Sequence, residues 1–439
     1  MSGLTGIILF LTAIILAVII GTKTKCNIGI VGICFAFLIG TILMGKSIAE
    51  VISYFPTSLL FTMMIVTFFY GYSAHNGAIR NISNRMIYIC RNHVNLLPVV
   101  LYVSVFLVST MGAGAGAAPV IMSPIAFALS AQLGFDPVLA VLAVSLGSLA
   151  GGIQAWTSSG VMFKGIAEPT LGDAVASSVS WAYGATLFIV PTLFFLIVFL
   201  VLSRKQKAGN HIIEEVQPLN REQRLSLILI AVLMVMVIIP VFANMFFPNP
   251  ITRWFASKFD IKVLCAFGIV LCAGLKLGNT AEIIKNNIPW STILMVCGMS
   301  MMINMSVETG IADLMGSWLG NNIPVFLVVP LIILLGGLLS FVTTGPAVIF
   351  PLFIPMFPML AQTTGISVVV LTTALFAGTG ATGMSPFSQG GAMAITGCKD
   401  DSIRESLWSK QLLFAFLFLT FYLLAGLLGV FNLVASVFS

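Results

Sequence analysis

Long apolar stretches separated by short polar connections dominate the pattern of this chain. A helix needs about 18 to 20 apolar residues to cross the hydrocarbon core of a bilayer. Stretches of about this length or longer predict ten membrane crossings, at residues 4–21, 27–45, 57–76, 137–163, 178–203, 225–247, 261–278, 289–308, 366–396 and 408–438.

Two further apolar segments, 96–133 and 324–362, are too long for one crossing. Each has small residues and proline at its centre, from Ser109 to Pro119 in the first segment and from Ser340 to Pro346 in the second. Such residues interrupt a helix. Each segment is therefore predicted to be a re-entrant helical hairpin.

Matching residues recur along the chain and predict two repeats, residues 1–203 and 225–439, joined by a charged connector at 204–224. Each repeat would hold five crossings and one hairpin, and an odd number of crossings inverts the second repeat in the membrane. One constant offset in residue number connects the pairs Pro119 and Pro346, Pro124 and Pro351, Gly151 and Gly378, and Ser158 and Ser385.

His75 and Glu308 also occupy matching places, and each is followed two residues later by a glycine, Gly77 or Gly310. The favoured interpretation is a pair of capping residues at the membrane interface, and the alternative is that either side chain titrates during transport.

The distribution of positive charge predicts the orientation. With the amino terminus outside, only Lys46, Lys164, Arg253, Lys258 and Lys262 of the 20 Lys and Arg residues fall on the outer side. Cytoplasmic loops carry the excess of Lys and Arg in membrane proteins. We therefore expect an inner-membrane protein with both termini outside, whose first hairpin enters from the cytoplasm and whose second enters from outside.

Composition agrees with a membrane protein and excludes several other classes. Hydrophobic residues make up 59% of the chain, charged residues 8%, and the mean hydropathy is +1.10. The 20 basic residues are scattered through short connections, which argues against nucleic-acid binding. With three His, seven Cys without a CxxC pair, and no hydrolase or nucleotide-binding motif in a suitable context, the chain is expected to be neither an enzyme nor a cofactor protein.

Two of the predicted spans are broken, at 145–159 and at 378–388, where Gly, Ser and Thr are concentrated. Unwound backbone is tolerated in a membrane only where it is buried in protein or lines a polar cavity. The two breaks and the two hairpin tips therefore predict one enclosed polar site near the midplane. Thr157 or Ser158 would cap the helix after the first break, and Ser385, followed by Pro386, the helix after the second.

Helix amino termini at such a site attract anions, while freed carbonyls and hydroxyls suit a monovalent cation such as Na⁺. An anion and a cation bound side by side indicate symport, although close helix packing is the alternative explanation for any single glycine or serine here. The predicted substrate ligands are Thr110, Gly114, Gly116, Thr157, Ser158, Thr343, Thr344, Gly345, Ser385 and Ser388. The predicted Na⁺ ligands are Ser109, Gly112, Ser148, Gly151, Thr343, Gly378, Thr379 and Gly380.

Three segments resemble signatures of a known family: 288–298, 308–310, and 385–391, which reads Ser-Pro-Phe-Ser-Gln-Gly-Gly. With the repeats, hairpins and broken spans, the chain resembles the ion transporter superfamily. It is most similar to divalent anion/sodium symporters and to bacterial dicarboxylate carriers of the malonate-carrier (MatC) type. The resemblance implies a homodimeric elevator transporter, with a scaffold of residues 1–95 and 225–323 and a moving transport unit of 96–203 and 324–439.

The function expected from these arguments is Na⁺-coupled symport of a small organic dianion, a C3 or C4 dicarboxylate. Sodium-coupled members of the family carry Ser-Asn-Thr at both hairpin tips, whereas residues 114–116 and 342–344 contain no Asn. An H⁺-coupled, exchange or efflux transporter of another anion is therefore an alternative. A further alternative is the membrane subunit of a transporter that depends on a binding protein.

Overall fold

The computed structural model describes residues 4–89, 96–203, 217–247, 249–308, 310–341, 345–395, 398 and 400–438, and all regular structure in these ranges is helical. The first half contains α1 (Leu4–Thr24), α2 (Ile28–Phe37), α3 (Ile48–Ser53), α4 (Thr57–His75), α5 (Ala78–Ile89), α6 (Leu97–Val108), α7 (Gly114–Leu133), α8 (Pro137–Gly152), α9 (Ser158–Leu171) and α10 (Asp173–Leu202). The second half contains α11 (Arg221–Phe246), α12 (Pro250–Lys258), α13 (Ile261–Gly274), α14 (Thr280–Asn286), α15 (Trp290–Val307), α16 (Ile311–Asn322), α17 (Val325–Ser340), α18 (Phe350–Phe353), α19 (Phe357–Thr364), α20 (Val368–Thr382), α21 (Gln389–Ile395), α22 (Asp401–Leu427) and α23 (Val430–Phe438).

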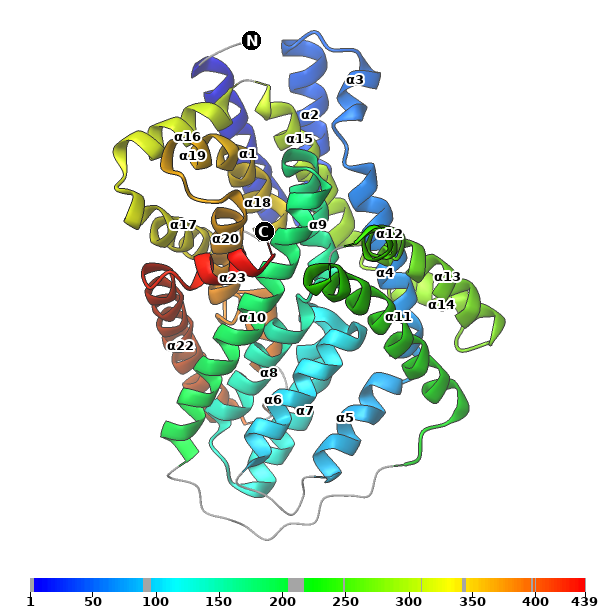
Figure 1. Cartoon of the computed structure of the whole chain (residues 1–439). Coiled ribbons are helices and arrows are strands. Elements are labelled where there is room, and N and C mark those ends of the chain that lie inside the picture. The colour runs from blue at the N-terminus through cyan, green and yellow to red at the C-terminus, as the bar shows by residue number, and fades with distance from the viewer. Residues whose placement is uncertain are drawn as a thin grey trace.

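Helical arms joined by short turns occupy both segments predicted to be hairpins, and they lie toward different ends of the molecule. Their re-entry stays a prediction, since the second arms, Gly114–Ala131 and Gly345–Thr364, are themselves long and apolar enough to cross a membrane. Helices α6 and α7 occupy the lower part of the view in Figure 1, and α17 and α19 its upper left. Short π-helical segments, Ser109–Ala113 and Gly345–Ile349, lie at the turns. Six described helices are long and apolar enough to cross a membrane, or seven if the bent pair α14 and α15 is one span. The ten crossings expected from the sequence stay a prediction.

The hairpins and broken spans repeat the same local geometry at a constant spacing along the chain. Gly134 and Gly365 have φ values of 74° and 72°, and Asp136 and Ser367 cap the helices that follow, α8 and α20. At the same spacing, Gly114 and Gly345 begin the second arms of the two hairpins. The hairpin turns therefore match at a spacing four positions longer than the prolines indicate, close to one helical turn. Gly151 and Gly378 keep the expected offset, since they pack in the same way against Phe106 and Ile333, which are separated by that offset.

Helices α4 and α15 also occupy equivalent places in the two halves. Their residues are separated in sequence by the same interval as His75 and Glu308, which is slightly longer than the interval between the hairpins. Pro56 and Pro289 immediately precede α4 and α15. Gly77 and Gly310, which follow these two helices, have φ values of 75° and 77°. A left-handed backbone at these positions favours glycine, so the pairing has a conformational reason.

These helices pack across the halves as well as within them. Helix α2 crosses α15, and α4 packs against α13. At the first crossing, a Cβ added to Gly298 would overlap the carbonyl oxygen of Gly29, and one added to Gly29 would overlap that of Leu294. Because lipid is as apolar as a leucine side chain, helices in a membrane associate through such close backbone contact.

Polar clusters join the two halves at the ends of α4 and α15. The imidazole of His75 lies 3.7 Å from the carboxylate of Glu282, which precedes α15 in the other half. Glu308 lies 2.8 Å from the ammonium of Lys46 and accepts a hydrogen bond from the Tyr54 hydroxyl. Hydrogen bonds from Lys46 and Tyr54 hold the pKa of Glu308 below its usual range. These residues join the two halves of the structure.

Substitution of Gly298 by Ala should destabilise the protein, because the added methyl group overlaps the α2 backbone and overpacking costs about 1–3 kcal/mol. The measurement is the melting temperature of the purified variant. Gly274→Ala is the control, since no atom lies within 4 Å of its added Cβ. A Gly298→Ala variant that melted with the parent would contradict the tight crossing.

Candidate functional site

Both broken spans are held open by one hydroxyl each, in the same geometry. At the first break, Thr157 Oγ1 accepts a hydrogen bond from the Gly160 N–H at 3.2 Å and lies 2.7 Å from the Gly152 carbonyl oxygen to which it donates. At the second, Ser388 Oγ accepts from the Gly391 N–H at 3.0 Å and lies 2.6 Å from the Gly383 oxygen. Each hydroxyl joins the end of one half-helix to the start of the next.

This geometry corrects the predicted cap of the second break. Helix α21 begins at Gln389, so Ser388 caps it and Pro386 precedes the helix. The buried Ser385 hydroxyl instead accepts from the N–H of Phe387 at 3.1 Å. Of the two candidates at the first break, Thr157 is the cap.

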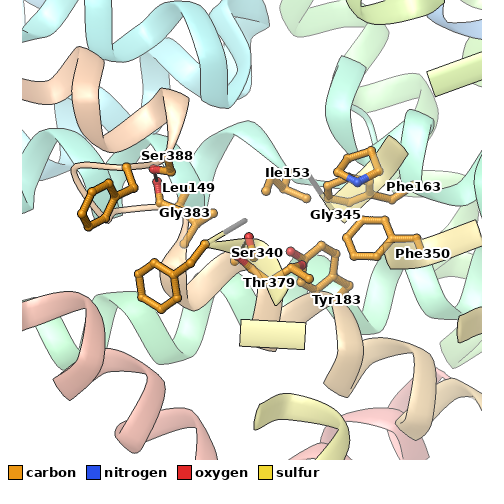
Figure 2. Close-up of a pocket in the computed structure, with 14 residues that line it drawn as sticks. Leu149, Ile153, Phe163, Tyr183, Ser340, Gly345, Phe350, Thr379, Gly383 and Ser388 are labelled. Carbon is orange, nitrogen blue, oxygen red and sulfur yellow. Dashed lines mark hydrogen bonds between the residues drawn. The ribbon is translucent and has the colours of Figure 1, made fainter. Parts of the chain in front are cut away.

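A cavity of about 290 Å³ opens beside the second break and the second hairpin tip (Figure 2). Its walls come from the second hairpin, from the broken span α20 and α21, and from three first-half helices. The lining residues are Ser340, Phe341, Gly345, Pro346 and Phe350; Thr379, Gly380, Gly383, Phe387 and Ser388; and Leu149, Ile153, Phe163 and Tyr183. Four of the predicted site residues, Gly345, Thr379, Gly380 and Ser388, thus line one cavity.

Hydroxyl groups provide the polar part of this cavity. Thr379 Oγ1 and the Tyr183 hydroxyl both donate to the Phe376 carbonyl oxygen, at 2.8 and 3.0 Å. Ser340 Oγ donates to the Thr379 carbonyl at 3.3 Å. Since their hydrogens are used within the protein, these oxygens can still accept hydrogen bonds or contact a cation. The lining residues include no Lys, Arg or His.

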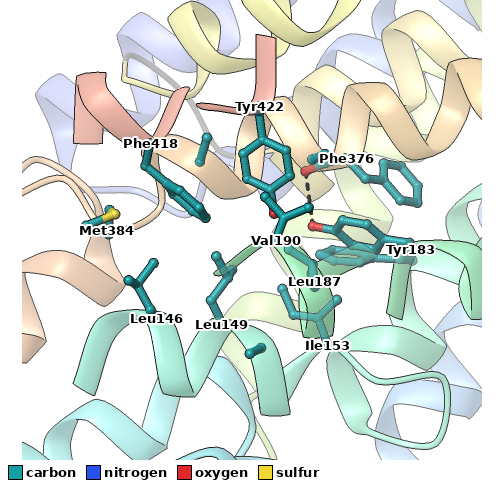
Figure 3. Close-up of a cluster of buried hydrophobic side chains, with 14 of the residues drawn as sticks. Leu146, Leu149, Ile153, Tyr183, Leu187, Val190, Phe376, Met384, Phe418 and Tyr422 are labelled. Atoms are coloured by element: carbon teal, nitrogen blue, oxygen red, sulfur yellow. Dashed lines mark hydrogen bonds between the residues drawn. The ribbon is translucent and has the colours of Figure 1, made fainter. Parts of the chain in front are cut away.

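Aromatic rings form one wall of the cavity. Phe163, Phe350 and Phe376 contact one another, with centroid separations of 4.2 to 5.2 Å, and Tyr183 packs on Phe376 at 5.1 Å. Next to this wall lies the buried cluster of Figure 3, in which Leu149 and Ile153 also approach Tyr183. This cluster closes the cavity on the side of α8 and α10.

The predicted residues of the first half gather around their own hairpin tip and do not line this cavity. Thr110 Oγ1 accepts a hydrogen bond from the Trp156 indole at 3.1 Å. Gly114 has a φ of 63°, and a Cβ added there would lie 3.3 Å from Ser158 Oγ. Gly116 faces open space. The single site expected to unite both tips stays a prediction.

Apart from Thr379 and Gly380, the predicted ion ligands lie away from this cavity or outside the described residues. Gly151 and Gly378 are packing positions, because an added Cβ would overlap the carbonyl oxygen of Phe106 or Ile333. Ser148 Oγ donates to the Ser145 carbonyl at 2.9 Å. Ser109 is buried at the tip, and its hydroxyl has no hydrogen-bond partner among the described residues. Gly112 lies in the same π-helical segment, whereas Thr343 and Thr344 lie outside the described residues.

Sequence reasoning missed the aromatic residues of the cavity. Phe163 and Tyr183 lie in apolar helices where nothing distinguishes them from core or lipid-facing residues. Phe341 and Phe387, however, directly adjoin the polar positions Ser340 and Ser388. Their position next to a predicted break or hairpin tip is the sequence feature that could have indicated an aromatic wall.

Comparison with known proteins agrees with this architecture. Residues 4–152 match the family model described as the N-terminus of the dicarboxylate carrier protein MatC. The resemblance to MatC-type carriers is confirmed over this part of the chain. No curated protein sequence matches the chain.

Solved structures show the same fold over most of the chain. The YdaH transporter of Alcanivorax borkumensis superimposes with a TM-score of 0.60 and 14% identity, over 90% of this chain and 88% of that one. MtrF of Neisseria gonorrhoeae is described as illuminating a class of antimetabolite efflux pumps. It superimposes with a TM-score of 0.60 and 14% identity, over 88% of this chain and 83% of MtrF. The MatC match over residues 4–152 and this shared fold agree with an integral membrane transporter.

Replacing Thr157 by Ala should destabilise the protein by about 1 kcal/mol, the usual cost of losing a helix cap. Ser158→Ala, which removes the neighbouring hydroxyl outside the cap, should leave the melting temperature nearly unchanged. Thermal unfolding of both variants is the measurement. Equal effects at the two positions would show that Thr157 has no special role at the break.

Proposed function

We propose that the protein is a secondary active transporter that imports a small organic dianion, a C3 or C4 dicarboxylate, together with Na⁺. The observation that carries this proposal is the cavity at the second hairpin tip and the break between α20 and α21. Backbone N–H groups at interrupted helices attract carboxylates without a basic side chain. The match of residues 4–152 to a dicarboxylate carrier model supports the substrate class.

Sodium coupling is supported by a difference between the halves. Ser109 and Ser340 occupy equivalent places at the two tips, because each lies five positions before the glycine that begins the second arm. Ser340 Oγ donates to the Thr379 carbonyl, whereas the buried Ser109 Oγ has no partner among the described residues. A buried hydroxyl without a partner is costly, and a Na⁺ ion would satisfy its oxygen.

Transport in this proposal follows an elevator mechanism. The geometry that recurs in both halves supports two inverted repeats with ten crossings, and helices packed across the halves support a scaffold of residues 1–95 and 225–323. The hairpins and broken spans, 96–203 and 324–439, would move with their cargo. We place the protein in the inner membrane as a homodimer, with both termini outside.

A second candidate is an efflux or exchange transporter for an anion with an apolar body. Five of the cavity residues are aromatic: Phe163, Tyr183, Phe341, Phe350 and Phe387. Such walls suit a ring or an alkyl chain better than a bare dicarboxylate. The fold shared with MtrF supports the same candidate. Transport that followed a pH gradient and ignored Na⁺ would favour it.

Sodium should raise the melting temperature of the protein relative to choline, and malonate, succinate or malate should raise it further only when Na⁺ is present. Ligand at a hundredfold excess over Kd stabilises the folded state by about 2.7 kcal/mol. Ser109→Ala should abolish the sodium effect. In the control Ser104→Ala, the lost hydroxyl had donated to Val100 within the same arm, so the effect should persist. A sodium effect that survived Ser109→Ala would exclude this ligand.

Thr379→Val should weaken Na⁺-dependent dicarboxylate binding about tenfold, because a cavity-lining hydroxyl oxygen that can contact the coupling cation is replaced by a methyl group of similar size. Isothermal titration calorimetry with succinate in the presence of Na⁺ measures the effect. Thr372→Val is the matched control on the same helix: its hydroxyl donates to the Val368 carbonyl at 2.8 Å, away from the cavity. Equal affinities of the two variants would place the substrate elsewhere.

A further inference from the structure

A second cavity lies on the other side of the loop that breaks α20 from α21. Its volume is about 470 Å³, and it is lined by Pro386, Ala392, Ile395, Arg404, Glu405 and Trp408. Pro386 lines this second cavity, and the next residue, Phe387, lines the first. Two adjacent residues of one loop therefore line different cavities.

The ring of Phe387 connects the two cavities, since Phe387 lines the first and contacts Trp408, which lines the second. It packs edge-on against Trp408, with the ring centroids 5.1 Å apart, although the two residues are 61% and 42% exposed. The backbone of the loop is held firmly, by the Phe387 N–H bond to Ser385 Oγ and by the bonds of Ser388. A ring that is exposed on a fixed backbone can rotate about its own side-chain bonds without disturbing the break.

A second aromatic pair also joins the lining of the first cavity to a neighbouring helix. Phe341, beside the hairpin tip, packs on Phe416 with centroids 5.3 Å apart. Trp408 and Phe416 both belong to α22. This helix thus provides a partner for each of two aromatic rings lining the first cavity, and the Phe387 pair adjoins the second cavity, whose walls include Arg404 and Glu405.

We propose that the second cavity is the antechamber of the binding pocket, through which organic anions pass Arg404, and that the paired rings of Phe387 and Trp408 close the passage. This inference rests on the proposed function only in taking the first cavity as the binding pocket. Arg404 on the antechamber wall attracts the carboxylate, and the neighbouring Glu405 disfavours a second negative charge beside it. The aromatic pair then separates this entrance from the pocket.

The test measures access to the first cavity and needs no known substrate. Ser340→Cys places a thiol in that cavity, and the full-length protein is labelled with an anionic methanethiosulfonate (sulfonatoethyl) or a cationic one (trimethylammonioethyl). Labelling of the parent protein, which retains Ser340, is subtracted to remove the contribution of the native cysteines. Melting temperatures confirm that each variant is folded.

Adding Trp408→Leu should raise the labelling rate about tenfold, because one half of the aromatic closure is removed. Phe387→Leu removes the other ring of the pair and should also raise the labelling rate. Phe416→Leu is the matched control and should leave the rate within about twofold of the parent value. Unchanged rates in both the Trp408 and Phe387 variants, or acceleration by Phe416→Leu alone, would overturn the proposed entrance.

Arg404→Gln should lower the ratio of anionic to cationic labelling about threefold, because the field at the antechamber becomes less positive. Lys410→Gln, on the same helix but not on the cavity wall, should leave this ratio unchanged. Equal ratios in the Arg404 variant and the parent would overturn the role of Arg404. Since labelling requires neither transport nor dicarboxylate binding, failure here is distinguishable from failure of the proposed function.

Discussion

The backbone of a membrane helix cannot leave its polar groups unpaired in hydrocarbon, and the rest of this structure depends on how that constraint is met. Two spans are broken, yet a single hydroxyl at each break, from Thr157 or Ser388, bonds to groups on both sides of it. The interruptions are thereby stable enough to persist inside a bilayer. A polar cavity can then form next to one of them without unfolding the helices around it.

The structure also depends on close packing of helix backbones against one another. Glycines at helix crossings, such as Gly29, Gly151 and Gly378, leave no room for a Cβ atom. In a membrane this contact replaces the hydrophobic driving force that packs soluble helices. The same residue type therefore has two roles here, since Gly380 lines the cavity, and Gly345 both lines it and packs closely against the Phe350 ring.

Structural features that depend on the order of apolar, small and polar residues within one segment could be predicted from the sequence. Apolar stretches with small residues at their centres located both hairpins and both breaks, and the spacing of His75 and Glu308 identified matching helix ends. The residue spacing that relates the two hairpins was harder to predict from the sequence. Residues four positions apart lie on nearly the same face of a helix, so two spacings that differ by four match the apolar pattern almost equally well. The aromatic wall was not predictable, since whether Phe163 faces lipid, core or cavity depends on tertiary packing, which periodicity does not record.

The exchange of partners between the halves has a consequence for biogenesis. Helix α4 leaves the ribosome early, but α13, against which it packs, is made only after every helix from α5 to α12. At ordinary rates of synthesis this interval is on the order of ten seconds or more. During that time α4 must be held by lipid, by the insertion machinery or by a temporary neighbour. Neither half can therefore complete its packing alone, and the native arrangement of α2, α4, α13 and α15 forms only after the second half has been inserted.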